Sequence, residues 1–128
     1  MTNRPVRLVL DRSALLAYVA GSVHVAEPLH EVEQDGVRFG VPVPVAAEAL
    51  NLAHGKDLAL MHRLLALDVC VLLPLTPEHL PELTFWRRIT GRLDLAAAAL
   101  AALTLDAAVL TSEGTRYGGG VPAIYFPE

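Results

Sequence analysis

The chain has 128 residues, a length that fits one domain. Hydrophobic residues make up 53% of it, which is enough to form a buried core and argues against a disordered protein. The formal net charge is −4, with only 10 Lys and Arg residues, so the chain lacks the charge of a protein that binds duplex DNA by electrostatics alone. A nucleic-acid enzyme is not excluded, because an acidic metal site contributes negative charge of its own.

The sequence also bears on the compartment. No uninterrupted apolar stretch reaches the ~18 residues of a membrane-spanning helix, and the N-terminus lacks the layout of a signal peptide. The single cysteine, Cys70, cannot form an intrachain disulfide, which favours a reducing, cytoplasmic environment. Because Cys70 lies in an apolar run with no activating group nearby, we expect an inert core residue.

The first half of the chain predicts two strands separated and followed by helices. Residues 5–10 form a short apolar run, which indicates a buried strand. Residues 13–20 and 23–34 have helical spacing, and a strand is expected at 37–43 after the turn signal Asp35-Gly36. Helical spacing returns at 45–54 and at 57–67, with Gly55 between the two helices.

The second half repeats the alternation. Residues 69–73 read as another buried strand, and Thr76 with Pro77 begins a helix that extends to about Thr90. Pro81 is expected to bend or split this helix. An alanine-rich helix is expected at 95–105, and strands at 108–111 and 123–126. Apolar strands that alternate with helices predict an α/β fold whose parallel sheet is covered on both faces.

Four acidic residues lie at the ends of these apolar elements. Asp11 and Glu113 each follow a predicted strand, whereas Glu48 and Asp94 lie near the starts of predicted helices. In open α/β sheets the ligand crevice lies beyond the carboxyl ends of the strands, so these carboxylates are expected to converge there. A bound Mg²⁺ or Mn²⁺ would remove their mutual repulsion. Each could instead be an ordinary loop, cap, surface or turn acid.

Four segments resemble the signatures of PIN-domain ribonucleases, in the same order along nearly the whole chain. Residues 9–17 are similar to the opening strand that ends in Asp and leads into a helix of small apolar residues. Residues 41–49 resemble the second signature, a strand followed by a helix with an embedded Glu. Residues 93–100 and 109–113 resemble an Asp ahead of an alanine-rich helix and a strand that ends in Thr-x-acid.

The resemblance implies a single PIN-like domain over residues 1–128, with three α/β/α layers and a central, mainly parallel sheet of four to five strands. It also implies an endoribonuclease that depends on Mg²⁺ or Mn²⁺. Glu48 would complete the acidic cluster and help to position or deprotonate the attacking water, while Ser13 and Thr111 would steady the site by hydrogen bonds. The residues that would bind the metal or its waters are Asp11, Asp94 and Glu113.

Many proteins of this family are toxins of VapBC-type toxin–antitoxin pairs. The resemblance therefore implies an RNA substrate, an antitoxin partner and a homodimer. If the domain only binds partners, the apolar helices at 13–20 and 23–34 could serve as the dimer or antitoxin surface. Two positions depart from the usual pattern: Arg12 replaces a small hydroxyl residue, and Glu113 replaces Asp. A PIN-like binding module that has lost its activity is the alternative to an enzyme.

Basic residues near an aromatic side chain are candidates for contact with single-stranded RNA. Arg87, Arg88 and Arg92 lie close after Trp86 and could form such a basic patch, although a solvated helix face with Trp86 in the core or in a dimer contact would give the same pattern. The residues put forward as RNA contacts are Arg12, Arg87, Arg88 and Arg116.

Three other kinds of site fit the sequence less well. His54 and His62 are the only histidines whose spacing is compatible with a zinc site, and they lie on separate predicted helices. A phospho-receiver domain would need an Asp at the end of the middle strand, and the 69–73 strand has none. A dinucleotide-binding domain would need a glycine-rich turn after the first strand, where Asp11-Arg12-Ser13 stands.

Overall fold

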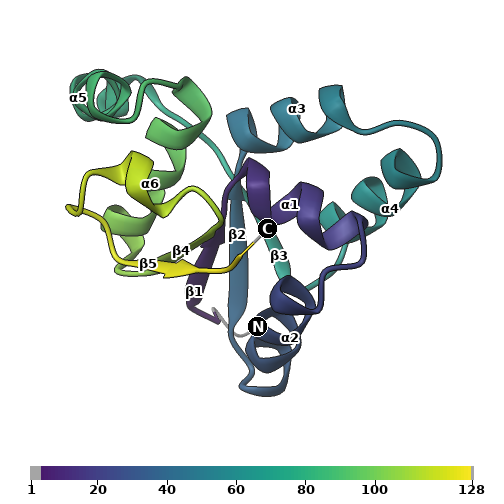
Figure 1. The fold of residues 1–128 in the computed structure, drawn as a ribbon. Helices are drawn as coiled ribbons and strands as arrows, with labels where there is room; N and C mark the ends of the chain where they lie inside the picture. The colour runs from purple at the N-terminus through teal and green to yellow at the C-terminus, as the bar shows by residue number, and fades with distance from the viewer. Residues whose placement is uncertain (1–3, 128) are drawn as a thin grey trace.

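A computed structural model describes residues 4–127, which form a five-stranded sheet surrounded by helices (Figure 1). All four strand pairings are parallel, and the strand order is β3-β2-β1-β4-β5. The strands are β1 (Val6–Leu10), β2 (Arg38–Pro42), β3 (Cys70–Leu73), β4 (Ala108–Thr111) and β5 (Ala123–Tyr125). The most N-terminal strand therefore lies in the middle of the sheet, between β2 and β4.

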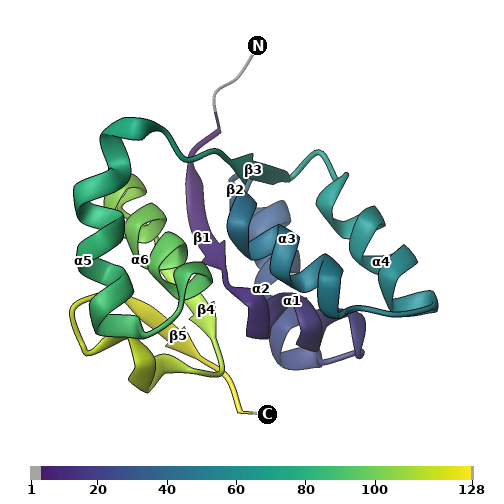
Figure 2. The same ribbon diagram turned by 90° about the horizontal axis from the view of Figure 1, so that it is seen from above.

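Helices cover both faces of the sheet. Figure 2 shows α5 and α6 on one side of the strands and α1, α2, α3 and α4 on the other. This split follows from right-handed crossovers, because the chain steps from β1 through β2 to β3 in one direction and then back to β4. The helices are α1 (Arg12–Val19), α2 (Val23–Gln34), α3 (Val43–Leu52), α4 (Lys56–Leu65), α5 (Leu80–Thr90) and α6 (Leu93–Leu105).

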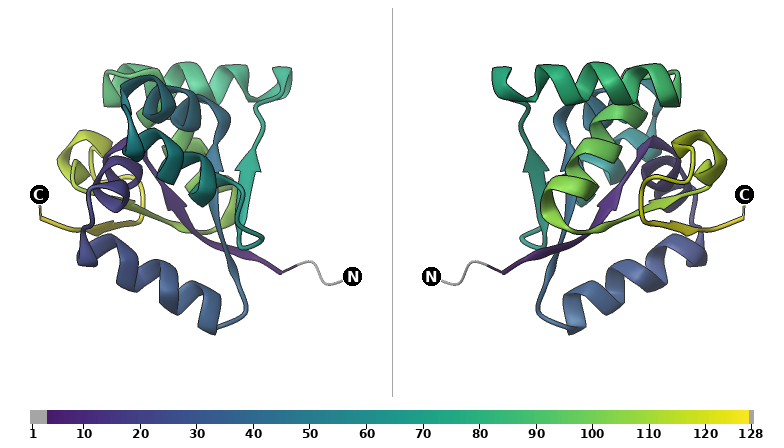
Figure 3. Two further views of the ribbon diagram at one scale, coloured as in Figure 1. Left: turned by 90° about the vertical axis from the view of Figure 1, so that its right-hand side faces the viewer. Right: turned by 90° about the vertical axis from the view of Figure 1, so that its left-hand side faces the viewer.

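The expected α/β/α layering and parallel sheet are confirmed. Figure 3 shows α2 and α5 on opposite sides of the molecule, with the strands between them. No helix in the described range 4–127 has the length and apolar character needed to cross a membrane.

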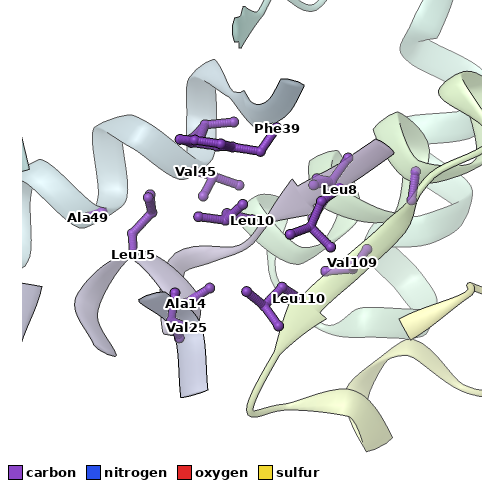
Figure 4. Close-up of a cluster of buried hydrophobic side chains, with 14 of the residues drawn as sticks. Leu8, Leu10, Ala14, Leu15, Val25, Phe39, Val45, Ala49, Val109 and Leu110 are labelled. Atoms are coloured by element: carbon purple, nitrogen blue, oxygen red, sulfur yellow. The ribbon is translucent and has the colours of Figure 1, made fainter. Parts of the chain in front are cut away.

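The core is centred on β1, whose last three residues are almost completely buried. Figure 4 shows Leu10 next to Leu15 of α1 and Val45 of α3, with Leu110 of β4 close by. On the other face, α6 packs against β1, β2 and β4. Its buried alanines at 96–99 and 102 have short side chains, which let this helix lie close to the strands.

Two elements differ from the sequence-based expectation. The strand at 69–73 was expected to be buried, but β3 is an edge strand and Leu72 is 48% exposed. An apolar run does not reveal whether a strand has neighbours on both sides. The helix expected at 76–90 is split, as Pro81 suggested: Pro77–His79 form a 3₁₀ turn, and α5 begins at Leu80.

The different burial of β1 and β3 gives a stability prediction. Leu10→Ala should destabilise the protein by about 2–5 kcal/mol, because it removes a fully buried side chain and leaves a cavity. Leu72→Ala is the matched control in the half-exposed strand, and it should cost less than about 1.5 kcal/mol. Urea unfolding followed by circular dichroism measures both values, and equal losses would contradict the assignment of β3 as an exposed edge.

Candidate functional site

Asp11 lies directly after β1 and is completely buried. As the N-cap of α1, its Oδ1 accepts a hydrogen bond from the Ala14 N–H at 3.1 Å and a second from the Ser13 hydroxyl at 2.6 Å. The Tyr117 hydroxyl donates to the other oxygen, Oδ2, at 2.8 Å. Both oxygens of this buried carboxylate are therefore paired within the protein.

Burial raises the pKa of Asp11 above its usual value, and the hydrogen bonds from Ser13, Thr111, Tyr117 and the Ala14 N–H oppose that rise. The pKa of the Tyr117 hydroxyl is also raised, first by burial and then by the neighbouring charge of Asp11. Tyr117 therefore stays protonated and acts as a fixed donor to Asp11.

A chain of hydroxyl groups connects the ends of β1 and β4. The Ser13 Oγ, which donates to Asp11, accepts a hydrogen bond from the Ser112 N–H at 3.0 Å and lies 3.5 Å from the Thr111 Oγ1. The Thr111 Oγ1 accepts the Glu113 N–H at 2.8 Å. Ser13 and Thr111, the two predicted supporting residues, thus hold the backbone that carries Glu113 in a fixed position relative to Asp11.

Asp94 and Glu113 meet at the same edge of the sheet, bridged by Arg92. The Arg92 Nε and Nη2 donate to the two oxygens of Asp94 at 3.0 and 2.9 Å. The Nη1 and Nη2 donate to the two oxygens of Glu113 at 2.9 and 3.1 Å. Such two-point pairing of a guanidinium with a carboxylate is among the stronger ionic contacts in proteins.

This arrangement governs the ionisation of Asp94, whose side chain is only 4% exposed. Burial by itself would raise the pKa of Asp94, but the hydrogen bonds and charge of Arg92 outweigh it and hold the pKa below its usual value. The pKa of Arg92 is raised by the same contacts. Both groups are therefore charged at neutral pH.

Glu48 does not share this pairing. It lies in the middle of α3, not near its start as expected, and it is half exposed. One of its oxygens accepts a single contact from the Arg12 Nη1 at 3.3 Å. Arg12 therefore contacts Glu48 directly and donates to neither Asp94 nor Glu113, although its charge contributes to the lowered pKa of Asp94.

Two cavities flank these residues. One of about 400 Å³ is lined by Arg87 and by two ion pairs, Arg12–Glu48 and Arg92–Asp94. The other, of about 590 Å³, lies between α1 and the C-terminal segment and includes Arg12, Ser13 and Glu113 in its wall. Arg12 belongs to both cavities, so the two spaces meet beside it.

The predicted RNA-contacting arginines are not all brought together. Arg12 and Arg87 line the 400 Å³ cavity. Arg88 is exposed and lines neither cavity, and Arg116 lies against the end of α5, where its Nε donates to the Thr90 carbonyl at 3.4 Å. The sequence pattern around Trp86 could not separate Arg87 from Arg88, because neighbouring helical residues point in different directions.

The expected metal site is not preassembled. Within residues 4–127, no three His, Cys, Asp or Glu side chains are arranged to hold a metal ion. The chemistry of the Asp94–Glu113 pair is nevertheless suited to Mg²⁺ or Mn²⁺, because both carboxylates already direct their oxygens at one cation, the Arg92 guanidinium. Asp11 does not contact Arg92, and both of its oxygens accept hydrogen bonds from other groups of the protein.

Two residues of this site were missed or misplaced by sequence analysis. Tyr117 was not a candidate, since a tyrosine beside a glycine-rich loop gives no sign that its hydroxyl reaches a carboxylate 106 residues away. Arg92 was considered only as part of a basic patch for RNA and of the connection before the alanine-rich helix, and not as a partner of the acids. Its position two residues before Asp94 was a usable signal, because opposite charges that close to a helix start can pair.

Known structures share this architecture. A chain of a toxin–antitoxin complex from Klebsiella pneumoniae matches with a TM-score of 0.74 and 13% identity, over 94% of this chain and 99% of that one. VapBC2 from Rickettsia felis, bound to a DNA fragment from its promoter, matches with a TM-score of 0.73 and 10% identity, over 94% and 98% of the two chains. FitAcB from Neisseria gonorrhoeae matches with a TM-score of 0.66 and 15% identity, over 94% and 97%.

The chain has a PIN-like fold. At this level of sequence identity the likeness concerns the fold, and it confirms the architecture that the sequence motifs implied. No protein-family model matches the sequence, and no curated protein matches it. The PIN-like fold explains why acids far apart in the sequence gather at one edge: β1 and β4 are adjacent and parallel, so Asp11 and Glu113 leave the sheet side by side.

The Asp11–Tyr117 contact predicts the effect of a small substitution. Tyr117→Phe keeps the ring but removes the donor to a buried carboxylate, and it should lower the free energy of unfolding by about 1–3 kcal/mol. Tyr125→Phe, at a tyrosine that is 63% exposed, is the matched control and should change stability by less than about 0.5 kcal/mol. Chemical denaturation measures both, and a neutral Tyr117→Phe would show that Asp11 does not depend on this hydroxyl.

Proposed function

We propose that this protein is a metal-dependent endoribonuclease that hydrolyses phosphodiester bonds in RNA, and that it acts as the toxin of a toxin–antitoxin pair. The observation that carries the proposal is the gathering of Asp11, Asp94 and Glu113 at the carboxyl edge of β1 and β4. The likeness of the fold to chains of VapBC and FitAB complexes supports the same conclusion.

In this proposal Asp94 and Glu113 hold a Mg²⁺ or Mn²⁺ ion, and Asp11 and its hydroxyl network fix the position of the backbone around it. When bound, such an ion lowers the pKa of water and stabilises the charge that develops on a phosphodiester. Glu48 lines the same cavity as Asp94 and is half exposed. Once the contact between Arg12 and Glu48 breaks, the Glu48 carboxylate could accept a proton from an attacking water.

Arg12 and Arg87 supply the charge for binding RNA in this proposal. Both line the cavity that contains Asp94 and Glu48, so a phosphate drawn to them would lie next to the acidic residues. The chain as a whole is acidic, with a net charge of −4. Local basic side chains must therefore counter the repulsion between the protein and its substrate.

An antitoxin partner, a homodimer and a cytoplasmic location complete the proposal. The helices expected to form the contact surface bury most of their apolar side chains, since Val25 and Leu29 of α2 pack into the core. Of the large apolar side chains of α2 only Val23 is exposed, whereas on α5 Phe85 and Ile89 lie one helical turn apart at 55% and 43% exposure. We therefore place α5 in the contact surface.

A PIN-like binding module without turnover is the second candidate. The observation that favours it is the pairing of Arg92 with all four carboxylate oxygens of Asp94 and Glu113, which satisfies the hydrogen bonding of the acidic pair and offsets one of its two negative charges without a metal. Such a module would bind RNA or a protein partner at the 400 Å³ cavity without cleaving it.

Cleavage of a mixed single-stranded RNA by the purified protein separates the two candidates. The enzyme should cut RNA with Mg²⁺ or Mn²⁺ and lose its activity in EDTA. Asp94→Asn should reduce the rate by at least about 100-fold, because it removes a charge that holds the metal. Asp68→Asn, at a carboxylate that is 98% exposed and paired with Arg4, is the matched control and should leave the rate unchanged. Metal-independent background cutting, equal in all three proteins, would reject the enzyme and leave the binding module.

The different positions of Arg87 and Arg88 give a separate test of RNA binding. Arg87→Gln should weaken the binding of a 2′-O-methyl RNA, which resists cleavage, more than Arg88→Gln does, since only Arg87 lines the cavity with Arg12. Loss of one phosphate contact should also reduce the slope of log K against log salt by about 0.7. Fluorescence anisotropy at several salt concentrations measures both effects, and equal slopes for the two variants would exclude this cavity as the RNA site.

A further inference from the structure

We propose that Arg92 is an internal counter-ion that competes with a divalent cation for Asp94 and Glu113, and that it thereby sets how tightly this site binds metal. The inference rests on the proposed function for the identity of the site, but it concerns a residue that the function does not require. Arg92 would act as a positioning residue and not as a catalytic one.

The first argument is the completeness of the pairing. Three nitrogens of Arg92 donate four hydrogen bonds, and they reach both oxygens of Asp94 and both oxygens of Glu113 at 2.9–3.1 Å. A hard cation such as Mg²⁺ or Mn²⁺ would need lone pairs of the same oxygens. The guanidinium and the metal therefore cannot both hold the pair in the arrangement that the structure shows.

The second argument is electrostatic. Asp94 and Glu113 together carry two negative charges, and Arg92 already supplies one positive charge beside them. A divalent ion that entered next to Arg92 would be repelled by it at a separation of a few ångströms, where the screening by salt is weak. Metal binding and the release of Arg92 should thus be coupled.

The third argument is that Arg92 has room to move. Its side chain is 24% exposed and lines the 400 Å³ cavity together with Arg12 and Arg87. Arg92 is the N-cap of α6, so it stands before the first helical residue and after Gly91, whose φ is +82°. The guanidinium could leave the two carboxylates by rotation of its side chain, without unwinding the helix.

Arg12 is a weaker competitor. It makes a single contact of 3.3 Å with Glu48, which is half exposed, and donates to neither Asp94 nor Glu113. The charge that limits metal binding is therefore assigned to Arg92.

Titration with Mn²⁺, followed by isothermal calorimetry, tests the proposal without any RNA. Arg92→Gln should bind Mn²⁺ at least about tenfold more tightly than the unmodified protein, because a competing charge has been removed. In EDTA this variant should melt at a lower temperature than the unmodified protein. Added Mn²⁺ should reduce this difference in melting temperature, because the ion binds the folded variant and stabilises it by mass action. The double variant Arg92→Gln/Asp94→Asn should lose the gain in affinity, which places the ion at this pair.

The matched control is Arg63→Gln, which removes the same charge from an exposed position on α4 and should leave Mn²⁺ binding unchanged. Equal affinities of Arg92→Gln and the unmodified protein would overturn the inference while leaving the ribonuclease proposal intact. If no variant binds Mn²⁺, the inference falls together with the metal requirement, and the cleavage assay then decides separately whether the protein is an enzyme.

A measurement on the unmodified protein covers the case in which Arg92→Gln does not fold. The NMR signal of the Arg92 Nε–H should shift when Mg²⁺ is added to saturation, because its hydrogen bond to Asp94 is broken. An unchanged Arg92 signal in a protein whose Asp94 signals respond to Mg²⁺ would show that the metal binds without displacing the guanidinium, and would overturn the inference.

Discussion

The buried carboxylate of Asp11 joins three parts of the chain that no other polar group connects so directly. It ends β1, caps α1 through the Ala14 N–H, and accepts the Tyr117 hydroxyl from the turn that follows β4. A buried charge of this kind is tolerated only when its hydrogen-bonding groups are satisfied. The positions of α1 and of the segment 114–117 are thus constrained together, and Glu113 lies between them.

Around this fixed centre, arginine side chains offset part of the negative charge. Arg92 supplies one positive charge to the two carboxylates of Asp94 and Glu113, and Arg12 faces Glu48. These contacts differ in strength, since Arg92 makes partly buried two-point contacts and Arg12 makes a single exposed contact. A ligand that binds these carboxylates must therefore exchange with an arginine side chain that already contacts them.

Much of the fold could be predicted from the sequence, because apolar strands and periodic helices carry their own signals. The positions of Asp11 and Glu113 could also be predicted, since both follow strands whose carboxyl ends share one edge of a parallel sheet. The exposed edge strand β3 could not, because burial depends on neighbours that a local run does not reveal. The partner of Asp11 could not be predicted, because Tyr117 reaches it from 106 residues away through a contact that no spacing rule specifies. Arg92 lies two residues before Asp94, so that contact was open to prediction, but the second contact of Arg92, with Glu113, was not.

The placement of β1 in the centre of the sheet has a consequence for synthesis. During synthesis Asp11 precedes its partner Tyr117 by 106 residues, and β4 must be complete before β1 has both neighbours. Contacts between such distant residues form late, because a long loop must close first. A nascent chain therefore carries no assembled site until the segment 114–117 has been translated, so the activity proposed for this protein would not appear before that point.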